Sequence, residues 1–161
     1  MKQVVKHLKP FTMEDLAIKF WKEFELSNIT LPQQPRIISE MAGNEHITNE
    51  LINLYLSGKK TAGSSLKRVF DEEDFPKSGD YWIVLDNKRI PKCILKTVKV
   101  EENKFGEVPL RISVAEGEGD LSLEYWRKAH IEFFASDLSE EQMQSIEDEA
   151  IITEHFELVH K

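Results

Sequence analysis

Residues 58–65 read Gly-Lys-Lys-Thr-Ala-Gly-Ser-Ser, and they follow a segment with helical hydrophobic spacing. Residues 115–120 read Ala-Glu-Gly-Glu-Gly-Asp, and they precede a second such segment. Core packing does not explain either stretch, because both consist of small, charged and hydroxylated residues. Their glycines let the backbone bend and present the neighbouring side chains. We therefore expect the two segments to face each other across one pocket.

The composition indicates a single soluble domain spanning residues 1–161. The chain has 161 residues, of which 40% are hydrophobic, and it contains no apolar run long enough to cross a membrane. Met1–His7 lacks the apolar stretch of a secretory signal. Cys93 is the only cysteine and cannot form an internal disulfide, and no histidine stands at metal-ligand spacing from it. We expect a cytoplasmic protein with no cofactor, no metal, no membrane association and no obligate protein partner.

The charge is unevenly distributed along the chain. The net charge is −8, which argues against a protein that coats DNA. Residues 57–100 nevertheless carry 10 lysines and arginines against 6 acidic residues. A basic middle in an acidic chain favours a small anionic or nucleotide ligand over an extended duplex.

Hydrophobic periodicity predicts several helices. One begins after Thr12, where Asp15 completes a relative of the capping box, and a second begins at Thr48 and ends before Gly58. A third covers residues 121–134 with Asp120 as its N-cap, and a short one covers residues 139–148. Residues 27–37 contain two prolines and are predicted to form an irregular connector.

Three strands are predicted, and their order decides the fold class. Tyr81–Leu85 and Pro91–Val100 are joined by a hairpin-type turn, and Ile151–His160 forms the last strand. Helices and strands do not alternate regularly, which argues against a doubly wound parallel sheet. We expect an α+β domain with a small curved or barrel-like sheet and helices packed around it.

Lys60 and Glu118 are the residues in the two segments that could carry chemistry. They could form a proton-transfer pair around a substrate or a plain ion pair, because a nearby carboxylate holds a lysine in its charged form. The hydroxyls of Thr61, Ser64 and Ser65 are candidate nucleophiles beside a lysine, although such residues also satisfy turns. Glu116 is expected to stand with Glu118 on flexible backbone before the third helix.

Trp126 and His130 are one helical turn apart in that third helix. A tryptophan there could stack on a base, but an anchoring role in the core is favoured. We expect His130 to be hydrogen-bonded within the same packing layer.

The order of these motifs resembles the ASCH family, whose domains are relatives of the PUA RNA-binding fold. The resemblance runs from about Glu50 to the last strand and includes Ser-Leu-x-x-Trp-Arg-x-x-His-x-x-Phe-Phe at residues 122–134. The segment Phe20–Phe24 also resembles the larger bacterial ASCH proteins, so residues 1–40 are expected to form a helical extension. The implied fold is a PUA-like small β-barrel with peripheral helices.

The resemblance implies a ligand cleft for RNA or a nucleotide between Lys59–Ser65 and Glu116–Asp120. One bacterial branch consists of amidohydrolases that deacetylate N4-acetylcytidine. Its catalytic lysine and glutamate fall on Lys60 and Glu118, and its threonine falls on Gly63, with Ser64 one residue later.

Three functions follow as alternatives. The first, which we favour, is a module that binds RNA, a nucleoside or a nucleotide. The second is an amidohydrolase that uses Lys60, Ser64 and Glu118, and the third is a ribonuclease. The expected ligand-binding residues are Lys59, Thr61, Ser65, Lys67, Arg68 and Glu116.

Overall fold

The structure is a computed structural model that describes residues 12–27 and 35–161. Met1–His7 and most of the predicted connector at residues 27–37 lie outside the described residues. The described elements, in chain order, are α1 (Met13–Leu26), β1 (Ile37–Glu40), α2 (Glu45–Leu56), β2 (Ala62–Leu66), β3 (Tyr81–Leu85), β4 (Pro91–Lys104), α3 (Leu110–Glu116), α4 (Leu123–Phe134), α5 (Glu140–Gln144) and β5 (Ala150–His160).

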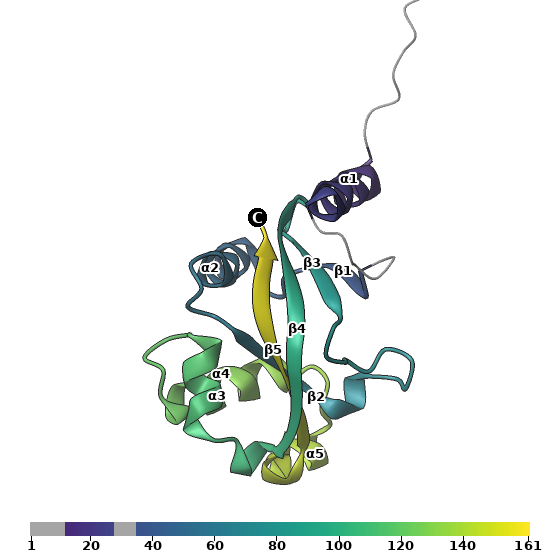
Figure 1. The fold of residues 1–161 in the computed structure, drawn as a ribbon. Coiled ribbons are helices and arrows are strands. Elements are labelled where there is room, and N and C mark those ends of the chain that lie inside the picture. Colours follow the sequence, from purple (N-terminus) through teal and green to yellow (C-terminus); the bar gives the residue numbers. More distant parts are fainter. Residues whose placement is uncertain (1–11, 28–34) are drawn as a thin grey trace, which may run out of the picture.

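The five strands form one curled, half-barrel sheet in the order β1-β3-β4-β5-β2. Strand β1 runs parallel to β3, and every other pairing is antiparallel. The long strands β4 and β5 form the centre of the sheet, with α1 near one end and α3, α4 and α5 near the other (Figure 1). The predicted α+β, PUA-like architecture with helices around a curved sheet is confirmed.

Helices α1 and α2 cover opposite faces of the sheet near β3. Ile83 packs with Trp21 and Phe24 of α1, whereas its neighbour Val84 packs with Ile52 and Tyr55 of α2. Successive side chains of a strand point to opposite faces, so β3 contributes to two separate apolar clusters. A third cluster joins α3 and α4 to β2 and β5 at the other end, and it contains Leu66, Phe105, Val108, Ile112, Trp126, Phe134, Ile146 and Ile151.

Capping side chains move two helix starts away from the predicted positions. Helix α2 begins at Glu45 and not at Thr48, because the Asn44 side chain accepts the Ile47 N–H. Asparagine is the better N-cap, and the Thr48 hydroxyl instead donates to the Met41 carbonyl in the interior. Helix α4 begins at Leu123 and is capped by Ser122, while Asp120 accepts the Ser122 N–H one turn earlier.

The remaining boundaries show which signals were readable. Strand β3 has the predicted bounds, β4 extends four residues further than predicted, and the α1 capping box at Thr12 and Asp15 is present. The predicted helix at 139–148 is split into α5 and a short 3-10 turn. Strands β1 and β2 and helix α3 were not among the predicted elements.

Candidate functional site

The two segments meet in direct contact, without the open cleft that was expected between them. The Thr61 N–H donates to the Ala115 carbonyl at 2.7 Å. Gly117 lies so close to Lys59 that a β-carbon there would clash with the Lys59 carbonyl oxygen. The backbone of residues 59–61 therefore packs against the end of α3.

Helix α3 places Glu116 in the interior. The helix ends at Glu116 because Gly117 adopts the left-handed conformation, with φ 70°, that commonly terminates helices. Glu116 is consequently a fixed helical residue. The prediction that it stands on flexible backbone is wrong. Glu118 follows on the loop and stays partly exposed, with 25% of its side-chain surface accessible.

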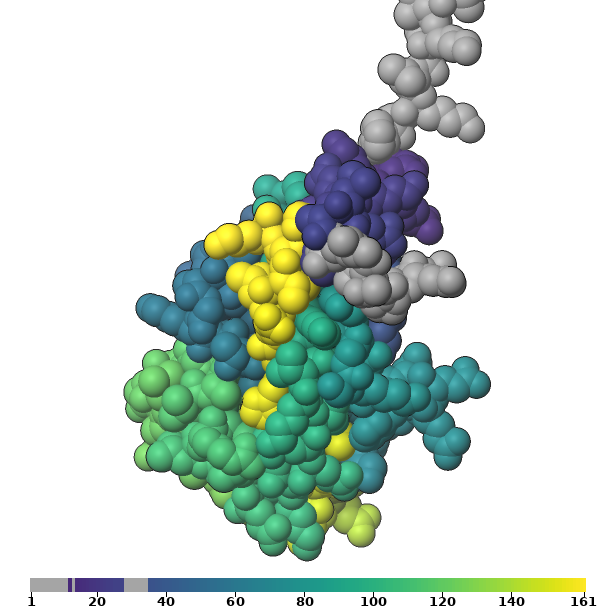
Figure 2. Space-filling model, in the orientation of Figure 1, coloured from purple at the N-terminus to yellow at the C-terminus, as the bar shows by residue number. Residues whose placement is uncertain are grey.

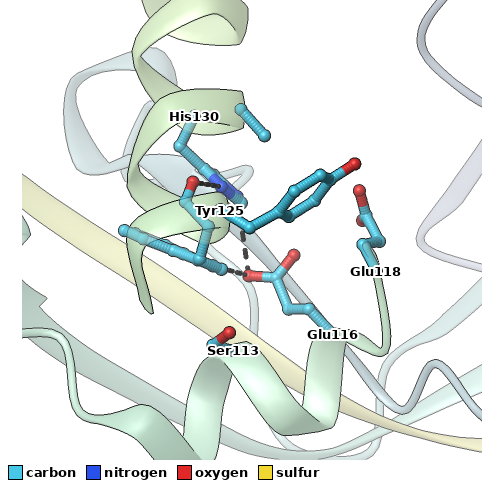
Figure 3. Close-up of a pocket in the computed structure, with 7 residues that line it drawn as sticks. Ser113, Glu116, Glu118, Tyr125 and His130 are labelled. Atoms are coloured by element: carbon cyan, nitrogen blue, oxygen red, sulfur yellow. Dashed lines mark hydrogen bonds and ion pairs between the residues drawn. The ribbon is translucent and has the colours of Figure 1, made fainter. Parts of the chain in front are cut away.

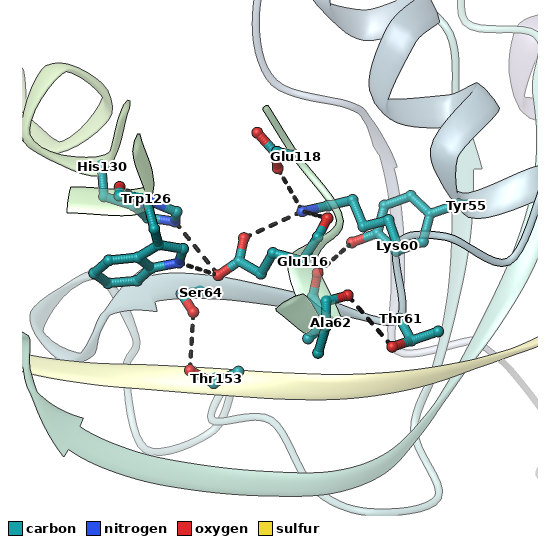
Figure 4. Close-up of polar contacts among 11 residues, drawn as sticks. Tyr55, Lys60, Thr61, Ala62, Ser64, Glu116, Glu118, Trp126, His130 and Thr153 are labelled. Atoms are coloured by element: carbon teal, nitrogen blue, oxygen red, sulfur yellow. Dashed lines mark hydrogen bonds and ion pairs between the residues drawn. The ribbon is translucent and has the colours of Figure 1, made fainter. Parts of the chain in front are cut away.

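Lys60 is buried between these two carboxylates. Only 5% of its surface is exposed, and its ammonium lies 2.6 Å from Glu118 Oε1 and 3.1 Å from Glu116 Oε2 (Figure 4). The same nitrogen also donates to the Glu116 carbonyl at 3.4 Å. All three N–H groups of the ammonium thus have acceptors within the protein.

Glu116 links Lys60 to helix α4. Its Oε1 accepts the indole N–H of Trp126 at 2.8 Å and lies 3.5 Å from Nε2 of His130. His130 donates from Nδ1 to the Trp126 carbonyl, since a carbonyl can only accept, and its ring stacks on Trp126 at 4.0 Å. The predicted anchoring role of Trp126 and the hydrogen-bonded His130 are both confirmed.

The electrostatics of this cluster keep Lys60 charged. Burial alone would lower the pKa of Lys60, but the Glu116 and Glu118 carboxylates outweigh burial and raise this pKa above its ordinary value. Burial opposes ionisation of Glu116, yet the Lys60 ammonium and the Trp126 N–H hold the pKa of Glu116 well below its usual range. Lys60 is therefore an ammonium donor here and not a free base.

A small pocket opens beside the cluster, on the α4 side. Figure 3 shows the Tyr125 ring lying between His130 and Glu118. The cavity volume is about 10 Å³, which is roughly enough for one water molecule. Tyr125 is 41% exposed and packs on Gly119, where a β-carbon would collide with the ring. The lining residues are Ser113, Glu116, Glu118, Tyr125, Trp126, Ala129 and His130.

Ser64, the candidate nucleophile, points to a different partner. Its buried hydroxyl is hydrogen-bonded to the Thr153 hydroxyl at 2.8 Å, and Ser64 is not among the described residues that line the pocket. A β-carbon at Gly63 would lie 3.2 Å from the Tyr55 hydroxyl and 3.6 Å from the Phe156 ring. A side chain at position 63 would therefore contact the apolar cluster that contains Tyr55 and Phe156.

The other predicted ligand-binding residues are spread around this site. Lys59 is exposed, Ser65 is half-buried, and the exposed Thr61 donates from its hydroxyl to the Ala115 carbonyl. Lys67 pairs with Glu102, and Arg68 pairs with Glu149. The structure thus brings Lys60, Glu116 and Glu118 together, whereas Lys67 and Arg68 belong to separate ion pairs.

Sequence reasoning missed three pocket residues, Ser113, Tyr125 and Ala129. Ser113 donates to the Leu121 and Ser122 carbonyls and so connects α3 to the start of α4. No motif marked Ser113 because α3 itself was not predicted. Tyr125 lies beside Trp126 in the sequence, but its exposure could not be read from the helical pattern.

Several other chemistries find no support in the described residues. Residues 12–27 and 35–161 contain no group of three or more histidine, cysteine or acidic side chains arranged to hold a metal ion. Cys93 is buried, and burial raises the pKa of its thiol to about 12, so it is a poor nucleophile. No helix in this part of the chain has the length and apolar character to span a membrane.

We expect Glu116→Gln to make the free energy of unfolding depend less on pH in the acid range. Because the folded-state pKa of Glu116 lies below its unfolded value near 4.5, its contribution is present above that value and is lost as the pH falls through the folded pKa. The variant should be less stable than the wild type by about 3 kcal/mol at neutral pH, with the difference shrinking below about pH 5. Urea unfolding at a series of pH values measures this.

Glu102→Gln is the control, because it removes an exposed carboxylate that pairs with Lys67 on the surface. Its stability should remain within about 0.5–1 kcal/mol of the wild type throughout. A constant difference between Glu116→Gln and the wild type at all pH values would contradict the assigned charge state.

Comparisons with known proteins place the chain in a family. The family model of the ASCH domain matches residues 39–160 of this chain. The crystal structure of an ASCH domain from Lactobacillus crispatus JV V101 superimposes with a TM-score of 0.79 at 25% identity, covering 96% of this chain and 100% of that one. Protein EF3133 from Enterococcus faecalis V583 gives a TM-score of 0.74 at 30% identity, covering 91% and 94%. No significant match to a curated protein was found. The chain belongs to the ASCH domain family.

Proposed function

We propose that this ASCH domain binds RNA or a nucleoside, and that Tyr125 and Glu118 contact the base and the ribose. The family is generally thought to bind RNA. The observation that carries the proposal is a half-exposed tyrosine beside a partly exposed carboxylate, above a buried ion pair that holds the carboxylate in place. Such a site offers a stacking surface and a fixed hydrogen-bond acceptor.

The charge of the pocket favours the base and the sugar over the phosphate. Glu116 and Glu118 together outweigh the single positive charge of Lys60. The pocket holds about one water molecule, so a base and ribose would bind over its mouth. The net negative charge there repels phosphate, and its carboxylates accept hydrogen bonds from ribose hydroxyls and exocyclic amines. Phosphate contacts by Lys59, Lys67 and Arg68 remain a prediction, and they would lie outside this pocket.

Tyr125 supplies the aromatic surface. Single-stranded RNA is commonly bound by stacking of unpaired bases on exposed aromatic rings. Tyr125 is positioned for this by Gly119, whose missing side chain lets the ring rest on the loop that carries Glu118. The stacking surface and the hydrogen-bond acceptor are thereby held next to each other.

The geometry favours binding over the two catalytic alternatives. The amidohydrolase alternative uses Ser64 beside Lys60, but the Ser64 hydroxyl is hydrogen-bonded to Thr153 and does not line the pocket, and Gly63 has no hydroxyl. A ribonuclease that uses Lys60 for proton transfer needs the lysine to lose its proton. The two neighbouring carboxylates, which raise the pKa of Lys60, oppose that step.

Tyr125→Ala should weaken nucleoside and RNA binding by roughly 10- to 100-fold, the usual cost of removing one stacking side chain. Calorimetric titration with cytidine, adenosine, N4-acetylcytidine and a short single-stranded RNA measures the loss. Phe133→Ala is the matched control, because Phe133 is a half-exposed aromatic residue of the same helix outside the pocket. This control should bind as the wild type does.

Two results would overturn the proposal. The first is a folded wild-type protein that binds none of these compounds. The second is loss of the acetyl group from N4-acetylcytidine in the same samples, abolished by Lys60→Ala, which would establish the amidohydrolase instead.

A further inference from the structure

Three nitrogen-bearing side chains, from an arginine, a lysine and a histidine, converge on one carboxylate away from the pocket. The Glu101 carboxylate of β4 accepts hydrogen bonds from both terminal nitrogens of Arg111, at 2.6 and 2.8 Å. It also accepts hydrogen bonds from Nε2 of His155 at 2.7 Å and from the Lys99 ammonium at 3.1 Å. The three donors come from α3, β5 and β4, so the tertiary fold brings this group together.

The group carries an excess of positive charge at the surface. Lys99 and Arg111 bring two permanent positive charges against the single negative charge of Glu101. Lys99 and Arg111 are 57% and 55% exposed, whereas Glu101 lies beneath them at 14%. The carboxylate therefore holds the cations from below, and their outer faces meet the solvent.

Several other exposed cations of the described residues each pair with a single carboxylate. Examples are the pairs Lys67–Glu102, Arg89–Glu40 and Lys104–Asp148. Within residues 12–27 and 35–161, Glu101 is the one carboxylate that contacts a lysine, an arginine and a histidine together. In a chain with a net charge of −8, such a fixed group with excess positive charge is a local attractor for anions.

The group lies next to the Lys59–Ser65 segment. His155 is the β5 partner of Ala62, and the Thr61 carbonyl accepts the Phe156 N–H at 2.7 Å. Arg111 is one helical turn from Ala115, whose carbonyl receives both the N–H and the hydroxyl of Thr61. On the face shown in Figure 2, part of β5 reaches the surface between β4 and the α3–α4 region.

We propose that Lys99 and Arg111, oriented by Glu101 beside His155, form a phosphate-binding site. A bidentate pair with Glu101 uses only two of the five N–H donors of Arg111, and Lys99 uses one of three. Because Glu101 fixes these side chains in advance, little side-chain entropy is lost when an anion binds. The phosphate could belong to an RNA strand or to a free nucleotide, and its assignment to RNA rests on the function proposed above.

The first test compares ligands with and without a phosphate. Adenosine 5′-monophosphate should bind about tenfold more tightly than adenosine, and Arg111→Gln should abolish that advantage without changing adenosine binding. Arg89→Gln is the matched control, because Arg89 is equally exposed and pairs with one carboxylate at the turn between β3 and β4. If Arg111→Gln does not fold, Lys99→Gln makes the same test with Lys104→Gln as its control.

The second test separates the RNA strand from the free nucleotide. If the site binds an RNA strand, Arg111→Gln should reduce the slope of log affinity against log salt by about 0.7 for a short single-stranded RNA. An unchanged slope, together with a lost advantage of the monophosphate, would assign the site to free nucleotides.

Inorganic phosphate provides a readout that does not depend on the pocket. In NMR spectra of the labelled wild type, phosphate should shift the signals of Lys99, Arg111 and His155 but not those of Arg89, relative to sodium chloride of equal ionic strength. Shifts without any nucleoside binding would support this site and overturn the pocket function. No shifts at Lys99, Arg111 and His155, and a monophosphate that binds no better than its nucleoside, would overturn the phosphate site.

Discussion

Lys60→Met should lower the free energy of unfolding by about 3–5 kcal/mol, because it leaves the Glu116 carboxylate buried without its main counter-charge. A loss of this size corresponds to a melting temperature lower by roughly 6–20 °C for a chain of this length. Methionine approximates the length and volume of the lysine stem, so the loss reports the charge and not a cavity. Urea unfolding at neutral pH measures it.

Lys59→Met is the adjacent control. Lys59 precedes Lys60 directly but is exposed, and its replacement should change stability by less than about 0.5 kcal/mol. The double variant Lys60→Met with Glu116→Gln should recover part of the loss, because no uncompensated charge is then left in the interior. Equal losses for Lys59→Met and Lys60→Met would refute a buried ion pair.

Gly117→Ala should cost roughly 2–5 kcal/mol. The residue has φ 70°, which costs a side-chain-bearing residue about 1–2 kcal/mol, and its β-carbon would strike the Lys59 carbonyl. Relief of that clash requires the two segments to separate, so the variant should also lose ligand binding. Thermal unfolding and nucleoside titration measure the two effects.

Gly58→Ala isolates the contribution of the clash. Gly58 also follows a helix and has φ 74°, but no atom lies within 4 Å of the position that its β-carbon would take. It should show the conformational cost of about 1–2 kcal/mol and keep its ligand affinity. If both alanine variants lose the same stability, the contact between the two segments does not matter.

Local patterns predicted the fold where one physical signal dominated. Strand β3 alternates between two buried faces and is bounded by turn residues, so its limits were readable. The predicted start of α2 at Thr48 was wrong because Asn44 caps the helix, while the Thr48 hydroxyl makes a contact with the Met41 carbonyl that local sequence does not reveal. Strand β1 has four residues and depends on pairing with β3, which local sequence does not encode.

The site was predictable in part. The proximity of Lys60 and Glu118 followed from the family resemblance, and the distance between them is 2.6 Å. The central position of Glu116 could not be inferred, because the seven-residue helix α3 has no side-chain cap and was not predicted. The direction of the Ser64 hydroxyl depends on Thr153 of β5, almost 90 residues away in the chain.

Each of the three apolar clusters has its own tryptophan, namely Trp21, Trp82 and Trp126. Each indole N–H has a different acceptor, provided by Glu25, Ser39 and Glu116 respectively. Fluorescence of variants that retain one tryptophan would therefore follow the melting of each cluster separately. Coincident transitions would mean that the helix α1, the helix α2 and the ligand pocket unfold as one cooperative unit.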